Sequence, residues 1–308
     1  MTSIDESASI SVVITCYKEG NLLREAVASA LSQSPQEVVI VNDASPDART
    51  NAVCRDLESH PDVLVIWRQQ NGGPSVARNH GFEKARSDIL VPLDADDLLP
   101  ENALKSLGQA FKSNSNIGFV YGPYMRQDAL DRPAQSVFSR DISLETMLSA
   151  QPFSLSSRWQ LLGTTPIRKA VWQSVGKYDP TFGSHDLHDV EFWIRVLNSG
   201  CQYVAVRQPI YIWRKYLGRN SRQITPLSWY QIARKYFGIY CSANLDYRAY
   251  ELLLLGSQWE NRLEEAKLYR SKLWQCIKQG NYQFSSLVAI AIPARLFKFL
   301  AQQASKKR

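Results

Sequence analysis

The sequence lacks long apolar runs and clustered cysteines. No apolar stretch of the 308 residues reaches the ~18 residues that a membrane-spanning helix needs. No two of the five cysteines have metal-site spacing, and they are scattered at Cys16, Cys54, Cys201, Cys241 and Cys276. The polar, acidic N-terminus does not resemble a signal peptide. We therefore expect a cytoplasmic protein with reduced cysteines.

Acidic residues are absent from the last part of the chain. Nine of the 36 basic residues and none of the 29 acidic residues lie from Ala266 onward, which leaves 27 basic and 29 acidic residues before it. A nucleic-acid-binding domain normally has a basic face of its own, so we expect no nucleic-acid partner. The basic, amphipathic segment 285–308 leaves two interpretations open. It contacts the inner face of the cytoplasmic membrane peripherally, or it is a helix packed on the rest of the protein.

Apolar runs alternate with helical patterns in the first part of the chain. The runs predict buried strands at residues 10–17, 37–43, 63–68, 89–93 and 117–122. Helices are expected at 21–32, 47–58, 74–85 and 100–112, with Pro74 and Pro100 in first turns. This alternation predicts an α/β fold with a doubly wound, mostly parallel sheet flanked by helices. Residues 126–153 look irregular; we then expect a helix at 188–200, strands at 202–206 and 209–214, and a helical region at 228–277.

Carboxylates follow two of the expected strands. Asp43 ends the run EVVIVND, and Asp94, Asp96 and Asp97 follow ILVPL closely. In a doubly wound sheet, ligands bind at the edge where the carboxyl ends of the strands meet. Hard carboxylate oxygens at such an edge suit Mg²⁺ or Mn²⁺, which would also balance the crowded negative charge. The alternative is that Asp96 or Asp97 caps the helix expected from Pro100, or starts a turn.

Four segments, in this order and spacing, resemble the family 2 inverting glycosyltransferases with the GT-A fold: VVITCYKEGNLLREAVASALSQ, EVVIVNDASPD, NGGPSVARNHGFEKA and VPLDADDLLP. A later stretch, GKYDPTFGSHDLHDVEFWIRV, resembles the acceptor half of that family. Each segment alone is weak evidence, whereas the ordered set is specific. The resemblance implies a GT-A domain at residues 1–222, with a nucleotide half at about 8–125 and an acceptor half at about 150–222. A helical C-terminal region at 223–308 would follow.

The resemblance also implies a site for a nucleotide-diphospho-sugar, and a UDP-sugar is expected. Asp43 matches the aspartate that accepts a hydrogen bond from uracil, and Arg78 and Asn79 match a nucleotide-facing pair. Asp94 would lie near the ribose, and Asp96 would hold the metal on the diphosphate. The other residues assigned to this donor site are Thr15, Tyr17, Glu19 and Gly73.

On the acceptor side, Asp189 matches the aspartate of the family's Glu-Asp motif and is the candidate catalytic base. Glu191 is the alternative base, and it lies on a different face of the expected helix. Two positions depart from the family. His188 stands where glutamate is common, and Tyr216 stands where many relatives have a metal-binding histidine. Arg214 or a basic neighbour would then help to neutralise the diphosphate.

The sequence therefore predicts a metal-assisted, inverting glycosyltransferase that acts on a hydroxyl of a glycan or lipid-linked acceptor, in cell-envelope polysaccharide synthesis. A nucleotidyltransferase is one rival, but TCYKEGNLL after the first strand lacks a Gly-rich phosphate loop. A catalytically decayed protein that binds glycans or nucleotides is another, and His188 and Tyr216 keep it open. A dehydrogenase is disfavoured because no GxGxxG motif follows the first strand.

Overall fold

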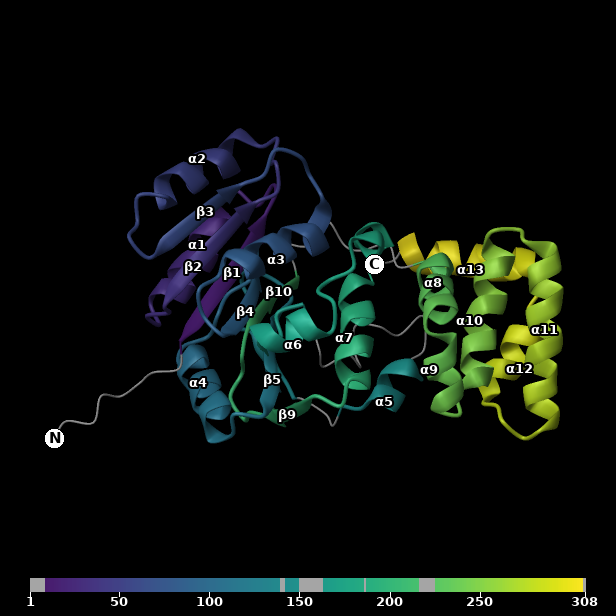
Figure 1. Ribbon diagram of the computed structural model, residues 1–308. Coiled ribbons are helices and arrows are strands. Elements are labelled where there is room, and N and C mark those ends of the chain that lie inside the picture. The colour runs from purple at the N-terminus through teal and green to yellow at the C-terminus, as the bar shows by residue number, and fades with distance from the viewer. Residues whose placement is uncertain (1–8, 139–141, 150–162, 186, 216–224, 307–308) are drawn as a thin grey trace. The chain divides into compact units, whose positions relative to one another are not determined.

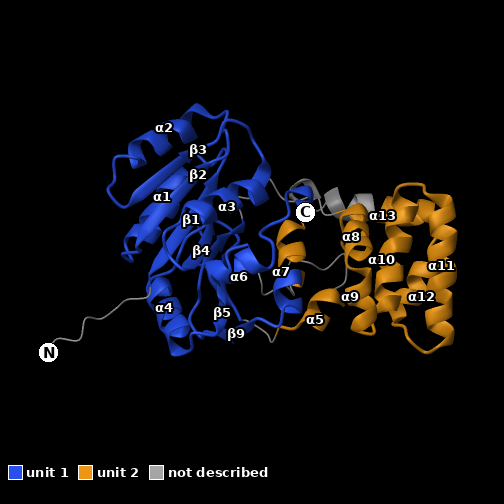
Figure 2. Cartoon of the chain, in the orientation of Figure 1, with its two compact units in different colours: residues 1–141, 160–183, 195–220 blue, residues 142–159, 184–194, 221–308 orange. Residues whose placement is uncertain are grey.

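The computed structural model of the protein describes residues 9–138, 142–149, 163–185, 187–215 and 225–306 (Figure 1). The chain forms two compact units (Figure 2). Unit 1 comprises residues 1–141, 160–183 and 195–220, and unit 2 comprises residues 142–159, 184–194 and 221–308. The domain boundary expected at residue 222 stays a prediction.

Unit 1 is built on a seven-stranded sheet with the order β3-β2-β1-β4-β8-β5-β9. Most neighbouring strands are parallel, whereas β8 is antiparallel to both of its neighbours. The strands are β1 (Ile10–Cys16), β2 (Glu37–Asn42), β3 (Val63–Trp67), β4 (Ile89–Asp94), β5 (Ile117–Tyr121), β8 (Ile167–Arg168) and β9 (Gln202–Ala205). A second sheet has the order β10-β6-β7, with β6 (Tyr124–Gln127), β7 (Gln135–Val137) and β10 (Ile212–Arg214).

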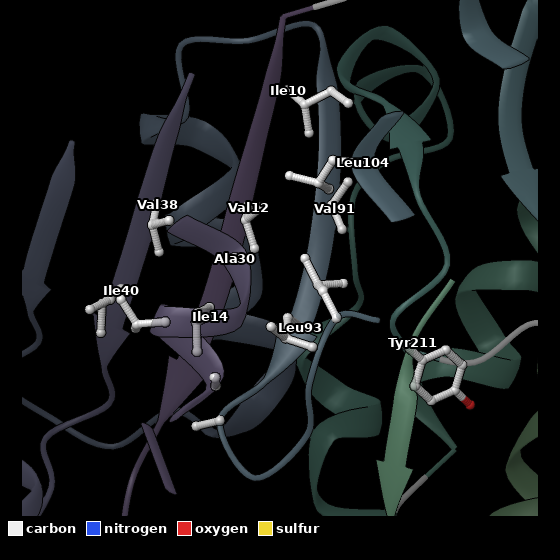
Figure 3. Packing of buried hydrophobic residues seen from close by; sticks show 14 of the residues in the cluster. Ile10, Val12, Ile14, Ala30, Val38, Ile40, Val91, Leu93, Leu104 and Tyr211 are labelled. Carbon is white, nitrogen blue, oxygen red and sulfur yellow. The ribbon is translucent and has the colours of Figure 1, made fainter. Parts of the chain in front are cut away.

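Helices cover both faces of the large sheet. Successive strand residues point to opposite faces, and Val12 and Ile14 of β1 belong to one buried cluster with α1, α2 and α4. Figure 3 shows part of this cluster, with side chains of β1, β2 and β4 beside Ala30 and Leu104. The helices on this face are α1 (Asn21–Leu31), α2 (Ala48–Leu57) and α4 (Ala103–Ser113). The predicted α/β fold, with helices on both sides of a mostly parallel sheet, is confirmed.

Helix α3 (Gly73–Lys84) packs on the other face at unusually close range. A Cβ at Gly81 would lie 2.4 Å from Val13 Cγ1 and 2.9 Å from Val41 Cγ2, so a larger residue does not fit without movement. Val13 points away from the cluster that contains Val12 and Ile14, which places α3 opposite α1. This contact fixes the height of Arg78, one turn earlier on α3, above the sheet.

The strand order reverses next to β1. From β1 the chain proceeds to β2 and β3 on one side, and β4 then pairs with β1 on the other side. Such a switch point opens a crevice at the carboxyl ends of the two central strands, where ligands bind in open α/β sheets. The segments that follow β1 and β4 begin with Tyr17 and Ala95, so both candidate loops flank this crevice.

Three expectations about single elements are wrong. Helix α4 begins at Ala103, so Pro100 lies in the preceding turn, outside the first helical turn. β3 is an edge strand with a single buried residue, Val65, because it has one neighbour and not two. Residues 126–153 are not wholly irregular, since they include β7 and helix α5 (Leu144–Leu148). Residues 139–141 and 150–153 of that segment lie outside the described residues.

The remaining described elements are helical. Unit 2 contains α5, α8 (Pro226–Lys235), α9 (Phe237–Ser242), α10 (Asp246–Trp259), α11 (Leu263–Lys278), α12 (Phe284–Ala291) and α13 (Ala294–Lys306). α6 (Lys169–Ser174) belongs to unit 1, while η2 (Pro180–His185) and α7 (His188–Asn198) are divided between the units. The predicted helical C-terminal region is confirmed. Among the described helices, none is both long enough and apolar enough to cross a membrane.

Candidate active site

In the loop that follows β1, backbone N–H groups bind the carboxylate of Glu19, a residue of the same loop. Thr15, near the end of β1, is paired with Asp94 of β4. The backbone N–H groups of Tyr17 and Lys18 donate to Glu19 Oε2 at 2.5 and 2.8 Å. Ser45, in the loop after β2, donates a hydrogen bond to the carbonyl of Tyr17. Three of the predicted donor-site residues therefore lie at the carboxyl end of β1, where the fold predicts a ligand crevice.

Asp43 organises the loop that leads into α3. Its carboxylate accepts hydrogen bonds from Arg68 Nη1 at 2.6 Å, Asn71 Nδ2 at 3.0 Å, and the N–H groups of Gly72 and Gly73 at 3.1 and 2.8 Å. Gly73 has a φ of +76°, a conformation that side chains disfavour and that lets successive N–H groups face one anion. A carboxylate offers about four lone-pair sites. A nucleobase that donates a hydrogen bond to Asp43 must therefore share the carboxylate with these donors or displace one of them.

Helix α3 carries Arg78 and Asn79 to two different partners. Arg78 is buried, its Nη2 lies 3.0 Å from Asp94 Oδ1, and its guanidinium lies 5.3 Å from the centroid of the Tyr178 ring. Asn79 Nδ2 donates to the carbonyl of Tyr178 at 2.7 Å, and Asn79 Oδ1 accepts from Trp172 Nε1 at 3.2 Å. Arg78 therefore positions Asp94, and the Asn79 amide binds the segment after α6. Direct contact of Arg78 or Asn79 with a nucleotide stays a prediction.

The acidic cluster after β4 is crowded. Burial raises the pKa of Asp96 to about 6, and the charges of Asp94 and Glu19 act in the same direction. Burial and the charges of Asp94 and Asp96 also raise the pKa of Asp97 well above its ordinary range. In the described part of the chain, the Asp96 carboxylate has no hydrogen-bond or ion-pair partner from another side chain. A cation placed at Asp96 would therefore relieve the repulsion within the cluster.

Arg214, the last residue of β10, lies against this cluster and is almost fully buried. Its backbone N–H donates to Asp97 Oδ1 at 2.8 Å, and its Nε donates to the carbonyl of Asp96 at 2.5 Å. The same guanidinium forms an ion pair with Glu25 of α1, and Nη2 has no hydrogen-bond partner among the described residues. Asp97 thus joins the loop to β10, and neither Asp96 nor Asp97 caps α4. The sequence-based alternative of a helix cap is wrong.

A divalent cation fits part of this site. Groups of three or more His, Cys, Asp or Glu side chains that could enclose a metal are not found among the described residues, and Tyr216 is outside them. Mg²⁺ is usually held by one or two carboxylates together with substrate phosphates, however, and does not need a complete protein cage. Asp96 and Asp94 provide such a partial set of hard oxygen ligands. The donor set therefore suits a metal that arrives with a diphosphate.

The two candidate bases lie in unit 2, in the first turn of α7. Asp189 is buried, and its Oδ1 lies 3.2 Å from His188 Nε2. Glu191 Oε1 accepts from Lys235 Nζ at 2.7 Å and from the hydroxyl of Tyr236. Burial and the contact with Glu191 raise the pKa of Tyr236 to about 12. Glu191 thus joins α7 to α8, while the Asp189 carboxylate lies beside His188.

Contacts within unit 1 connect most of the predicted donor-site residues. Asp43 binds Gly73 at the start of α3, Arg78 of α3 binds Asp94, and Asp96 follows Asp94 in the chain. Sequence reasoning missed Arg68, Asn71 and Tyr178, which contact Asp43, Arg78 and Asn79. The turn-forming pattern Asn71-Gly72-Gly73 was a usable signal for the loop, but Arg68 and Tyr178 carry no local pattern that marks them.

Residues 11–166 match the family model described as glycosyl transferase family 2, which covers half of the chain. The chain belongs to glycosyl transferase family 2. The prediction from the sequence that the protein is a glycosyltransferase is confirmed. Among curated relatives, the poly-β-1,6-N-acetyl-D-glucosamine synthase of Staphylococcus aureus is 28% identical over 122 residues. That match covers 39% of this chain and 29% of the synthase, so the chain spans less than a third of that relative's length. An uncharacterized glycosyltransferase of Nostoc sp. is 27% identical over 175 residues, which cover 56% of this chain and 54% of the relative.

Solved structures share the GT-A fold of this family member. S. aureus TarS residues 1–349 in complex with UDP-GlcNAc gives a TM-score of 0.61 at 16% identity, with 97% of this chain and 90% of that chain covered. The mannosyltransferase PcManGT from Pyrobaculum calidifontis, in complex with GDP-Man and Mn²⁺, gives a TM-score of 0.54 at 16% identity. That comparison covers 97% of this chain and 86% of the mannosyltransferase. At 16% identity, these comparisons show a shared fold alone.

Proposed function

We propose that this family 2 protein transfers a sugar from a UDP-sugar to a hydroxyl of a glycan or lipid-linked acceptor, with inversion at the anomeric carbon. The observation that carries the proposal is the Asp96 carboxylate. It follows β4 beside the strand-order reversal, its pKa is raised by burial and by neighbouring acids, and it has no side-chain partner in the described part of the chain. A positively charged ligand is what such a carboxylate favours.

The donor site would use the loops at the carboxyl ends of β1, β2 and β4. Asp43 would accept a hydrogen bond from the N–H of uracil, at a position held by the Gly72–Gly73 turn. Asp94, oriented by Arg78, would accept a hydrogen bond from the ribose. Thr15, Tyr17 and Glu19 form the neighbouring wall, and this proposal is supported by their common location at the end of β1.

Mg²⁺ or Mn²⁺ would be held by Asp96, with Asp94 beside it. When bound, such a cation stabilises the negative charge that develops on the departing diphosphate. Arg214 binds the carbonyl of Asp96 and the carboxylate of Asp97, and so fixes the loop that would receive the diphosphate. Its buried guanidinium also supplies a fixed positive charge. This charge would offset part of the contribution to metal binding that many relatives obtain from a histidine at the position of Tyr216.

Asp189 would act as the catalytic base. As the acceptor oxygen attacks the anomeric carbon, the bond from that carbon to the diphosphate oxygen breaks, and the hydroxyl proton passes to the Asp189 carboxylate. Attack from the face opposite the leaving group inverts the configuration. Asp189 is the first candidate because it matches the aspartate of the family's motif, whereas the Glu191 carboxylate accepts hydrogen bonds from Lys235 and Tyr236 that join α7 to α8.

The acceptor class is proposed from the relatives. The S. aureus relatives are named as synthases of a poly-N-acetylglucosamine polymer, and 39% of this chain matches them. We therefore place this protein in polysaccharide or glycolipid assembly at the cell envelope, with the sugar, linkage and acceptor to be identified by assay.

Calorimetry with UDP and Mn²⁺ tests the donor site directly. Wild-type protein is expected to bind UDP in a metal-dependent manner, and Asp96→Ala is expected to lose about 1.5–3 kcal/mol of binding free energy, the range for a hydrogen bond to a charged group. Equal affinity in the variant would remove the metal role from Asp96. Asp128→Ala, which changes an exposed acid of unit 1, is the matched control.

Turnover assays separate the rival functions. Release of UDP from a panel of UDP-sugars supports the transferase. Release of pyrophosphate from UTP and a sugar phosphate would instead support a nucleotidyltransferase. UDP binding without turnover of any tested nucleotide sugar would support a protein that only binds its ligand.

A further inference from the structure

Helix α12 turns its apolar side chains outward. Phe284 is 79% exposed, and Leu287 and Val288, three and four residues later, are 38% and 45% exposed. Residues at these spacings share one face of a helix. The hydroxyls of Ser285 and Ser286 point inward and donate to Glu251 Oε1 of α10 at 2.9 and 2.5 Å. A helix on the surface of a globular protein normally has the opposite polarity, with its apolar face inward.

Helix α13 repeats the pattern. Leu296, Phe299 and Leu300 share a face by their spacing, and all three are about half exposed. Phe297 is buried and anchors the helix, and Lys298 Nζ donates to Asn261 Oδ1 at 2.7 Å. Both helices pack on α10, and α12 also packs on α11 (Figure 1). Two consecutive helices of unit 2 therefore present apolar faces that the described part of the unit does not cover.

The last part of the chain, which includes α12, α13 and most of α11, is rich in basic residues. From Ala266 to the end, the sequence has nine basic residues and no acidic residue. Among them the exposed, described ones are Lys267, Arg270, Lys272 and Lys278 of α11 and Arg295 of α13, and Lys267 is paired with Glu264 at the start of α11. Exposed apolar patches of this kind mark sites of interaction. Large apolar side chains next to Lys and Arg, without acids, are the composition of helices that lie in the interface of anionic membranes.

We propose that the outward faces of α12 and α13 dock this protein on the surface of an anionic lipid bilayer. The apolar side chains would insert at the boundary between head groups and acyl chains, and the Lys and Arg side chains would bind lipid phosphates. A second copy of the chain is a poorer occupant, because two surfaces without acids repel each other. Nucleic acid is also poorer, because Phe, Leu and Val offer no donors to phosphates. This inference goes beyond the proposed function and does not depend on it.

Vesicle flotation with the full-length protein tests the proposal. Wild type is expected to float with vesicles that contain phosphatidylglycerol and to remain unbound with pure phosphatidylcholine. Phe284→Ser is expected to reduce partitioning about tenfold, because its large side chain leaves the apolar phase. Salt at about 1 M is expected to release the protein, since the screening length falls to about 3 Å.

The matched control is Phe138→Ser. Phe138 is 76% exposed and lies in unit 1, outside the two helix faces, so its substitution should leave vesicle binding unchanged. Circular dichroism melts establish that both variants remain folded. The proposal is overturned if wild type does not bind anionic vesicles, or if both variants bind equally well. It is also overturned if sedimentation shows a dimer that Phe284→Ser dissociates while vesicle binding is absent, since the occupant is then a second copy.

Discussion

Replacing Asp96 by asparagine should stabilise the metal-free protein. Burial and the charges of Asp94 and Glu19 raise the pKa of Asp96 from 3.8 to about 6. The folded protein thus binds this proton more tightly than the unfolded chain does. The stability that the bound proton of Asp96 contributes to the fold is fully present below about pH 4 and is lost as the pH rises through about 6. One pKa unit corresponds to about 1.4 kcal/mol, so ionised Asp96 costs the fold about 3 kcal/mol at pH 7.5.

The amide of Asp96→Asn keeps the shape of the side chain and removes its charge. We expect the variant to exceed wild type by about 1–3 kcal/mol in unfolding free energy at pH 7.5, after the cost of burying an amide is deducted. The advantage should shrink as the pH falls from 7.5 to about 4. Asp97 also titrates in this cluster, so the quantity to compare is the difference between the two proteins at each pH.

Urea unfolding in EDTA, followed by circular dichroism at pH 5, 6 and 7.5 (a range about the raised pKa), measures this difference. Asp128→Asn, an exposed acid, should change stability by less than about 0.5 kcal/mol. If Asp96→Asn is less stable than wild type at pH 7.5, or if its advantage is the same at all three pH values, the electrostatic reasoning is refuted. Saturating UDP and Mn²⁺ should reduce the advantage of the variant, because a ligand at about 100 times its Kd adds about 2.7 kcal/mol to the wild type and less to a variant that binds it more weakly.

Four other substitutions follow from the packing and the site. Arg214→Met should lower the unfolding free energy by about 3 kcal/mol, since it removes a buried cation from an acidic cluster, and unchanged urea midpoints would contradict this. Gly81→Ala should cost about 1–3 kcal/mol because its Cβ would meet Val13, and an unchanged melting temperature would show that α3 can shift freely. Asp189→Asn should reduce sugar transfer at least about 100-fold while UDP affinity is retained, and Glu191→Gln should retain most activity but lose stability; the opposite result would exchange their roles.

Strand ends were predictable because their pattern is local. A buried parallel strand reads as a continuous β-branched run, so β1, β2 and β4 could be located within one or two residues. The acids that follow β2 and β4 were then placed at one edge of the sheet by topology alone. β3 was misjudged because the same apolar pattern fits an edge strand. The apolar pattern of a sequence does not indicate how many neighbouring strands a strand has in the sheet.

Partners distant in the chain could not be predicted. Arg214 was expected near the diphosphate, but its bonds to Asp96 and Asp97 depend on β10, which pairs with β6 and with Leu98 directly after these acids, and no local pattern encodes those pairings. Asn79 was expected at the nucleotide, but its amide binds the backbone of Tyr178, 99 residues later. A motif gives residue types, whereas hydrogen-bond partners depend on the tertiary contacts around them.

The acids at this sheet edge differ in what balances their charge. Asp43 has Arg68, and Asp94 has Arg78. Asp97 has the N–H of Arg214. In the described part of the chain, the Asp96 carboxylate has no ion pair or side-chain hydrogen bond, and burial together with Asp94 and Glu19 raises its pKa despite the nearby charge of Arg214. Selection for stability alone would remove a carboxylate in this position, since its charge lowers the unfolding free energy by about 3 kcal/mol at neutral pH. An acid kept at a net cost, at a strand-order reversal, is best explained by a ligand that supplies the missing positive charge.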